Sequence, residues 1–454
     1  MTDIAQHIDR FKQTLGMSNI RKVTFRNAGE VAGSFHPFSE RHVLCKEISD
    51  VLNELVNDRK VELTLYQTLS PSIELRQANL SRINFLRSEH RFDLLRHHLP
   101  TSLKSLSLPP TFKGSLDNVL PDGLETLNLV SSLQWNKPIT EGSLPSSLQT
   151  LKLSSSFNQV IEAHSLPLSL KSITFGWSFN HPLNGVLPPS LTFLDLTLTR
   201  GYSHDLMSLP QSVTSIQLPL FFQQALDHPP LQRLQVHSHV PHGHPFPRLE
   251  KLAFSYLMDS TNFDASLFPN IARLSIYDGD MVLDLSKVQQ LSGTLKHCRL
   301  NRGGHPAPML APIPFGVTKL ALAKCDFAQT SPYFRRLPSS ITRLELRYPV
   351  GLKPGDIPHS VTSLSIKHDT LLDVNVLPIS VTDLTLNRGA HDKGAIINQL
   401  PTTIGSITLE LTLIGGTLNL IRLDDRHYFR HGLWTNYYGF IDKDTLPSMI
   451  SSYY

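Results

Sequence analysis

The chain has 454 residues, of which 40% are hydrophobic and 18% charged, and its formal net charge at neutral pH is +4. This composition describes a soluble, foldable chain, and so small a positive excess does not by itself indicate nucleic-acid binding. No window of about 18 apolar residues occurs, and residues 1–19 mix acids and bases, so we expect neither a membrane span nor a secretory signal. Three cysteines are too few for a disulfide framework, so we expect a reducing, cytoplasmic compartment.

The first 98 residues are less regular than the rest of the chain. Residues 20–25 have the pattern of an isolated strand, residues 39–57 carry apolar side chains at helical spacing, and residues 61–65 alternate as in a strand. Residues 80–85 already resemble the repeat described next. We predict that residues 1–98 are an N-terminal cap over the open edge of a repeat array. The alternative is a small adaptor module such as an F-box, although no recognisable F-box pattern is present.

A ten-residue unit, L-P-x-S-L-x-x-L-x-L, recurs over residues 99–409 and is clearest at Leu144–Leu153. From Leu144 to Leu209 successive copies begin 21 or 22 residues apart, and a period of about 20–29 residues with this leucine spacing is typical of leucine-rich solenoids. Leu151 and Leu153 alternate, so both face one side of a short strand, and one coil cannot bury them alone. We therefore predict a β-rich, leucine-rich-repeat-like solenoid of about 15 repeats over residues 99–423. It has parallel strands on one concave face, few helices and a cap at both ends.

A second motif lies in the other half of the coil. Residues 134–139 (Q-W-N-K-P-I) align with residues 156–161 (S-F-N-Q-V-I) and 178–183 (S-F-N-H-P-L). In these three consecutive units the chain resembles the FNIP-repeat family, named for an F-N-x-P-I stretch beside an L-P-x-S-L-x-x-L-x-L strand. The resemblance covers roughly residues 99–410. It implies a variant of the leucine-rich-repeat fold and a binding role, and it implies no catalytic residues.

The recurrence of this second motif at the same place in three consecutive coils predicts that its residues contribute to the core and to the turns. We expect Phe157 and Phe179 to stack in the core, and Asn158 and Asn180 to satisfy backbone groups in the turn; a ligand role for the asparagines is the alternative. The residues after each strand lack helical periodicity, so the back of each coil is expected to be irregular or extended. Cys298 falls on an interior leucine position and is predicted to be a small core residue.

Residues 229–247 break the period and hold His237, His239, His242 and His244. Four imidazoles this close could bind zinc or nickel. Prolines and glycines mark the segment as a loop, however, and no cysteine or carboxylate completes a ligand set. We expect an irregular, solvated loop and no metal.

The C-terminal residues 424–454 contain eight aromatic side chains, from Tyr428 to Tyr454. We predict that they cap the last coil; an aromatic docking surface is the alternative. Just before them, Leu418–Leu423 has the pattern of one more rung of the solenoid.

One outward-facing position of the repeat, immediately before the first leucine of the strand, is basic in six consecutive repeats. The residues there are Arg233, Lys251, Arg273, His297, Lys319 and Arg343. Parallel stacking at about 4.8 Å per rung would place them in one file, roughly 25 Å long, with Arg299 close by and Glu345 interrupting the charge. We hypothesise that this basic stripe on the concave face receives an acidic partner. The alternative is that these are ordinary solvated strand residues whose aliphatic stems cover their neighbours.

No catalytic pattern stands out in the chain. A Gly-rich phosphate loop, H-E-x-x-H, G-x-S-x-G and C-x-x-C are all missing, and a turn accounts for the Asp424–Asp425 pair near His427. We predict a protein that is not an enzyme, binds no cofactor and is a monomer. Its function is then that of a protein-interaction scaffold whose partner is unidentified. The alternatives are a polyanion or nucleic-acid binder, which the scarcity of aromatics in the stripe disfavours, and a substrate receptor of a ubiquitin ligase acting through an F-box-like N-terminal module.

Overall fold

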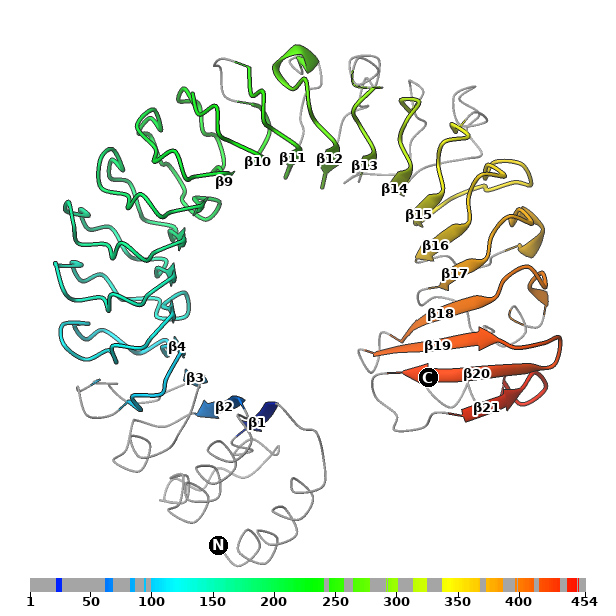
Figure 1. Cartoon of the computed structure of the whole chain (residues 1–454), viewed down its shortest axis with the longest axis horizontal. Coiled ribbons are helices and arrows are strands. Elements are labelled where there is room, and N and C mark those ends of the chain that lie inside the picture. Colours follow the sequence, from blue (N-terminus) through cyan, green and yellow to red (C-terminus); the bar gives the residue numbers. More distant parts are fainter. Residues whose placement is uncertain are drawn as a thin grey trace, which may run out of the picture. The chain divides into compact units, whose positions relative to one another are not determined.

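The computed structural model divides into two compact units, residues 1–231 with 241–243 and residues 232–240 with 244–454. The residues that it describes are 22–26, 62–67, 82–85, 94, 99–240, 245–256, 264–277, 291, 293–300, 313–324, 337–367, 373–386, 397, 399–411, 416–432, 439–446 and 448. Within each unit the strands lie on the concave side of the coils and the turns on the other side (Figure 1).

The described residues of the first unit form a ladder of nine parallel strands in sequence order. They are β1 (Lys22–Arg26), β2 (Glu62–Gln67), β3 (Arg82–Phe85), β4 (Ser105–Ser107), β5 (Thr126–Asn128), β6 (Thr150–Lys152), β7 (Ser172–Thr174), β8 (Phe193–Asp195) and β9 (Ser215–Gln217). The prediction that residues 20–25 form an isolated strand is wrong in one respect, because β1 pairs with β2. The helix predicted over residues 39–57 lies outside the described residues, and the boundary predicted at residue 98 stays a prediction.

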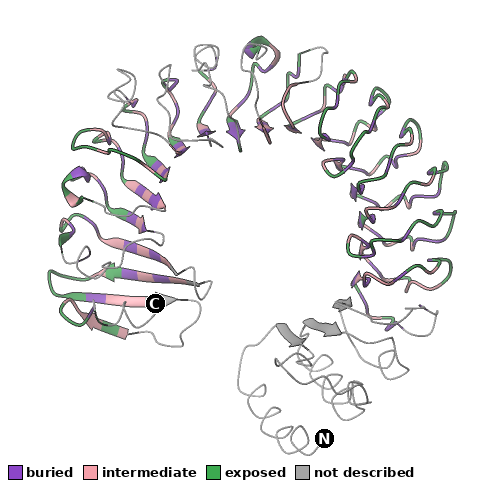
Figure 2. Cartoon of the chain, turned by 180° about the vertical axis from the view of Figure 1, so that it is seen from behind, coloured by how far each residue is buried: buried purple, intermediate pink, exposed green. Residues whose placement is uncertain are grey.

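From β4 to β9 each coil buries the strand residue that the repeat predicts. The central residue of every strand from β4 to β9 is almost fully buried, whereas the residue before it is partly exposed. The buried side chains line up because the parallel register places each one opposite its equivalent in the next coil. They are Leu106, Leu127, Leu151, Ile173, Leu194 and Ile216. Figure 2 shows this alternation of buried and partly exposed residues along the strands.

A spine of stacked aromatic rings fills the other half of these coils. Trp135 stacks on Phe157 with ring centroids 5.5 Å apart, and Phe157 stacks on Phe179 at 6.0 Å. The stack continues through Tyr202, 6.1 Å from Phe179, to Phe222, 6.4 Å from Tyr202. Each such pair contributes about 0.5–1.5 kcal/mol beyond the area that it buries. The predicted stacking of Phe157 and Phe179 is confirmed, and the spine extends two coils beyond the last Phe-Asn motif.

The asparagines beside this spine form a ladder of their own. The side-chain oxygen of Asn136 accepts the backbone N–H of Asn158 at 2.9 Å, and that of Asn158 accepts the N–H of Asn180 at 3.1 Å. The side-chain oxygen of Asn180 in turn accepts the N–H of Ser203 at 3.1 Å. The prediction that Asn158 and Asn180 satisfy backbone groups is confirmed, and each asparagine does so in the following coil.

The second unit is built from coils of the same kind and ends in an antiparallel segment. Its strands are β10 (Arg233–Val236), β11 (Lys251–Phe254), β12 (Arg273–Ile276), β13 (His297–Leu300), β14 (Lys319–Ala323), β15 (Arg343–Arg347), β16 (Ser363–Lys367), β17 (Asp383–Leu386), β18 (Ser406–Leu411), β19 (Gly416–Arg422), β20 (His427–Gly432) and β21 (Gly439–Asp442). Strands β10 to β18 pair in parallel. Two 3-10 helices, η1 (Ala265–Leu267) and η4 (Val374–Val376), lie in the turns.

The end of the second unit differs from the prediction. Leu418–Leu423 was expected to add a parallel rung, but β19 runs antiparallel to β18, and β20 and β21 follow as an antiparallel meander. The reason is the connection length, because β18 ends at Leu411 and β19 begins at Gly416. So short a connection makes a hairpin, whereas a parallel partner needs a crossover of about a dozen residues or more.

Part of the aromatic tail belongs to this meander. Tyr428 is buried, and its hydroxyl accepts hydrogen bonds from the Arg422 guanidinium at 2.8 and 3.1 Å. Phe429 and Phe440 meet edge to face at 5.7 Å. The remaining tail aromatics lie outside the described residues, and the cap over residues 424–454 stays a prediction. Helices with the length and hydropathy needed to cross a bilayer are absent from the described ranges.

Candidate functional site

The six basic residues predicted to form a stripe do lie in one file on the second unit. Arg233 is opposite Lys251, which is opposite Arg273 on the next strand. Further along the file, Arg273 is opposite His297, His297 opposite Lys319, and Lys319 opposite Arg343. Five rung-to-rung steps at about 4.8 Å give a file roughly 24 Å long.

The stripe faces outward because the residue that follows each member is buried. Those inward-facing neighbours are Leu234, Leu252, Leu274, Cys298, Leu320 and Leu344. Successive side chains of a strand point to opposite faces of the sheet, so burial of this hydrophobic row fixes the charged row on the solvent side. Arg233, Arg273, Lys319 and Arg343 are exposed, and Lys251 and His297 are half-buried. The geometry of the stripe therefore follows from the repeat, while its role in binding stays a prediction.

His297 is the uncharged member of the stripe at neutral pH. Its Nδ1 accepts hydrogen bonds from Nε and Nη2 of Arg273, at 3.2 and 3.0 Å. Partial burial lowers the pKa of His297, and the neighbouring cations, Arg273 and Lys319 foremost, lower it further. The ring is thus neutral and carries its proton on Nε2. The stripe presents five cations and one imidazole N–H.

Beside the stripe runs a second outward file, which holds Arg299, Ala321 and Glu345, and beyond it a third file holds Arg347 and Lys367; the charges in these two files are paired. Glu345 accepts a hydrogen bond from Nε of Arg347 at 2.6 Å and lies 3.7 Å from Nη2 of Arg299. Lys367 pairs with Glu410 at 2.8 Å. Arg299 was predicted to lie close to the stripe, and Glu345 to interrupt it; the two form an ion pair. Among the described residues, no ion pair involves a member of the stripe itself.

The stripe and the second file enclose an open depression of about 500 Å³ on β12–β16. Arg273, His297, Lys319 and Arg343 line it on the stripe side, and Glu345 lines it on the other. Arg299 and Tyr277 also line it. Its other outward side chains are short, which is why the surface is hollow there: Ser275, Ala321, Ser363 and Ser365. We did not predict these small residues. The sequence does contain a signal for this hollow. At the outward positions before and between the strand leucines, these repeats carry a small side chain where neighbouring repeats carry arginine or glutamate.

The histidine-rich segment is described only in part. His237 stacks on Tyr256 with ring centroids 5.9 Å apart, and Ser238 Oγ lies 3.2 Å from His239 Nδ1. His242 and His244 lie outside the described residues. Where the structure describes the chain, no three histidines, cysteines or carboxylates are grouped so as to hold a metal, and the expected absence of a metal stays a prediction.

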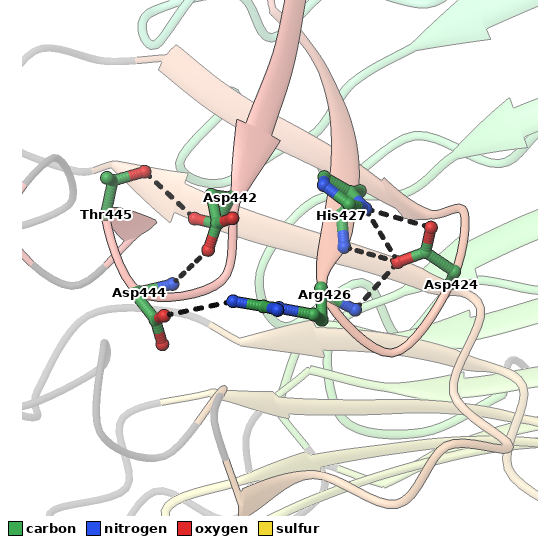
Figure 3. A network of polar contacts seen from close by, with 6 residues as sticks. All are labelled: Asp424, Arg426, His427, Asp442, Asp444 and Thr445. Atoms are coloured by element: carbon green, nitrogen blue, oxygen red, sulfur yellow. Dashed lines mark hydrogen bonds and ion pairs between the residues drawn. The ribbon is translucent and has the colours of Figure 1, made fainter.

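The carboxylates near His427 belong to the turn between β19 and β20 (Figure 3). Asp424 Oδ1 accepts the backbone N–H groups of Arg426 and His427, each at 2.7 Å, and lies 3.0 Å from His427 Nδ1. These hydrogen bonds, led by that from Arg426, lower the pKa of Asp424. Arg426 also reaches Asp444 at 4.0 Å. This exposed network closes a hairpin turn, in agreement with the turn that the sequence predicted for Asp424 and Asp425.

Cys298 is the core residue that its repeat position predicts. It is buried, and burial raises the pKa of its thiol to about 12, so the nucleophilic thiolate is suppressed at neutral pH. Cys45 and Cys325 lie outside the described residues.

The parallel strand ladder, the buried leucine rows and the turn-side aromatic and asparagine ladders define a leucine-rich-repeat-like β-solenoid. The model of the family described as "FNIP Repeat" matches residues 135–176, 157–198 and 351–389. The chain therefore contains FNIP repeats, and the predicted resemblance is confirmed. The third match lies beyond the last Phe-Asn motif, where only the strand half of the repeat is evident.

Solved structures of leucine-rich-repeat proteins are similar to this chain at low identity. CroV588, described as "a novel circular LRR protein structure", is 22% identical, with a TM-score of 0.46 over 77% of this chain and 59% of that one. YopM from Yersinia enterocolitica WA-314 is 19% identical, with a TM-score of 0.28 over 76% of this chain and 82% of that one. The chain thus spans about three fifths of the length of the first of these. No curated protein matches the sequence.

Proposed function

We propose that the chain is a protein-interaction scaffold, and that the strand face of its second unit binds an acidic segment of a partner protein. The observation that carries this proposal is the contrast between the stripe and the two outward files beside it. Cations of the second and third files are paired with Glu345 or Glu410, whereas the stripe lacks an anionic partner within the described residues.

Electrostatics favours an anionic ligand at such a file. Like charges on directly opposite strand positions are destabilising, by about 0.2–1 kcal/mol for a pair. A bound acidic segment relieves this repulsion and gains attraction from five cations. Because the stripe is exposed, salt screens the interaction over a Debye length of about 8 Å at physiological ionic strength. Binding should therefore be fast and salt-sensitive.

The test is direct binding of a fluorescein-labelled peptide of ten glutamates to the full chain, measured by fluorescence anisotropy. Reversing two charges of the stripe, in the double variant Arg273→Glu/Lys319→Glu, should weaken binding at least tenfold. The matched control is Arg248→Glu/Lys353→Glu, which makes the same change in net charge at exposed positions of the same unit outside the stripe. Circular dichroism melts of all three proteins verify that they fold alike.

Two outcomes contradict the proposal. One is an unchanged affinity in the stripe variant. The other is an equal loss in both variants, which would mean that the peptide senses net charge and not the stripe. A single-stranded oligothymidylate of 20 nucleotides, titrated in parallel, tests the polyanion alternative, because tighter binding of the oligonucleotide than of the peptide would favour a nucleic-acid binder.

A further inference from the structure

The depression on β12–β16 concentrates the charge of the stripe at one place. Three of the five cations, Arg273, Lys319 and Arg343, line it together with His297. These three cations and His297 come from four consecutive parallel strands, so the distance along the file from Arg273 to Arg343 is only about 14 Å. Within the described part of the chain, none of the three is in an ion pair.

The depression also offers uncharged hydrogen-bonding groups. His297 accepts from Arg273 through Nδ1, so its Nε2–H is a donor for a ligand. Ser365, which lines the depression from β16, has a buried hydroxyl oxygen without a hydrogen-bond partner among the described residues. This hydroxyl is covered, so its side chain would have to turn toward the depression to meet a ligand oxygen.

The short side chains decide what can enter. Ala321 stands between Arg299 and Glu345 in the second file, and these two side chains meet across it in their ion pair at 3.7 Å. The small Ala321 side chain leaves a hollow between that pair and the stripe. A phosphoryl group fits the charge of this hollow better than a carboxylate does. It carries about −1.5 to −2 at neutral pH and three strong acceptor oxygens, against one charge on a carboxylate, and guanidinium groups bind it through two parallel hydrogen bonds.

We propose that the depression binds the phosphoryl group of a phosphorylated side chain on the partner protein; this inference rests on the proposed function of the stripe. The depression is open and continuous with the rest of the file, so an extended segment can lie across the strands with its phosphate in the hollow. Arg233 and Lys251, which do not line the depression, then receive acidic residues that flank the phosphorylated one.

The experiment uses the full chain and three fluorescein-labelled peptides of one sequence, with four aspartates on each side of a central phosphoserine, glutamate or serine. We expect the phosphoserine peptide to bind at least tenfold more tightly than the glutamate peptide. The variant Ala321→Leu fills the hollow and removes no charge, so it should reduce the preference for the phosphoserine peptide over the glutamate peptide to less than threefold. Arg233→Gln, outside the depression, should weaken all three peptides by a similar factor.

The outcomes separate this inference from the function on which it rests. Equal binding of the phosphoserine and glutamate peptides overturns the phosphoryl site and leaves the acidic-partner scaffold standing. Failure of all three peptides to bind overturns both. Retention of the preference in Ala321→Leu removes the depression as the site. Inorganic phosphate that binds as tightly as the phosphoserine peptide would show a site for the free anion instead of a partner segment.

Discussion

Substitution of Gly176 by alanine should open the solenoid locally. A Cβ atom at Gly176 would lie 1.9 Å from the carbonyl oxygen of Ser154 and 2.6 Å from Cα of Ser155, both in the preceding coil. These neighbours are backbone atoms and cannot rotate away. The two coils would therefore have to separate by about 1 Å or more in a close-packed interior.

The size of the effect follows from the contacts that this separation breaks. Overpacking of a filled interior costs about 1–3 kcal/mol. The hydrogen bond from Ser178 N–H to Ser155 O, 2.8 Å long, is worth about 1 kcal/mol, and so is the stacking of Phe157 on Phe179. We expect a loss of about 3 kcal/mol in local stability, which corresponds to roughly 150-fold more frequent opening.

Hydrogen exchange measured by mass spectrometry reads this opening directly, because repeat arrays need not unfold in one step. Peptides covering residues 150–180 should lose protection in Gly176→Ala. The matched control is Gly201→Ala, since a Cβ at Gly201 meets no atom within 4 Å; it should be neutral or stabilise by about 0.4–1 kcal/mol. If Gly176→Ala exchanged as slowly as this control, the argument from coil-to-coil contact would be refuted.

Three further predictions concern single buried or bridging groups. Asn158→Ala removes the acceptor of the Asn180 N–H and should speed exchange of that amide about fivefold, at roughly 1 kcal/mol per lost bond, while Asn158→Asp, which keeps the oxygen, should not. His228 is buried, with Nε2 2.7 Å from Val213 O, and burial lowers its pKa below 6.5. The unfolded state then binds more protons below pH 6.5, so urea melts should show stability falling as the pH is lowered through this region, and falling less steeply in His228→Gln. Cys298 should resist alkylation by iodoacetamide at pH 8 until denaturant is added, because its pKa is about 12; labelling of the native protein at this residue, read by peptide mapping, would contradict its burial.

The candidate site shows where sequence reasoning succeeds and where it stops. The file from Arg233 to Arg343 was predictable, because a repeat that fixes which residues are buried also fixes which residues share an outward row. The pairing of Arg299 with Glu345, two rungs away, was not predicted, since it depends on side-chain lengths across the sheet. The depression depends in the same way on Ala321 lying between two long side chains.

The sequence by itself determined the coil: its period, its buried leucines, its stacked aromatics and the direction of each strand residue. These follow from local alternation and from the need of each coil to bury one face against the next. Tertiary structure alone decided where the parallel ladder ends and which charges remain unpaired. The first depends on a connection of a few residues after Leu411, which permits only a hairpin. The second depends on contacts between repeats, as in Glu345, which pairs with Arg299 and Arg347 while the stripe beside it stays without an acidic partner among the described residues.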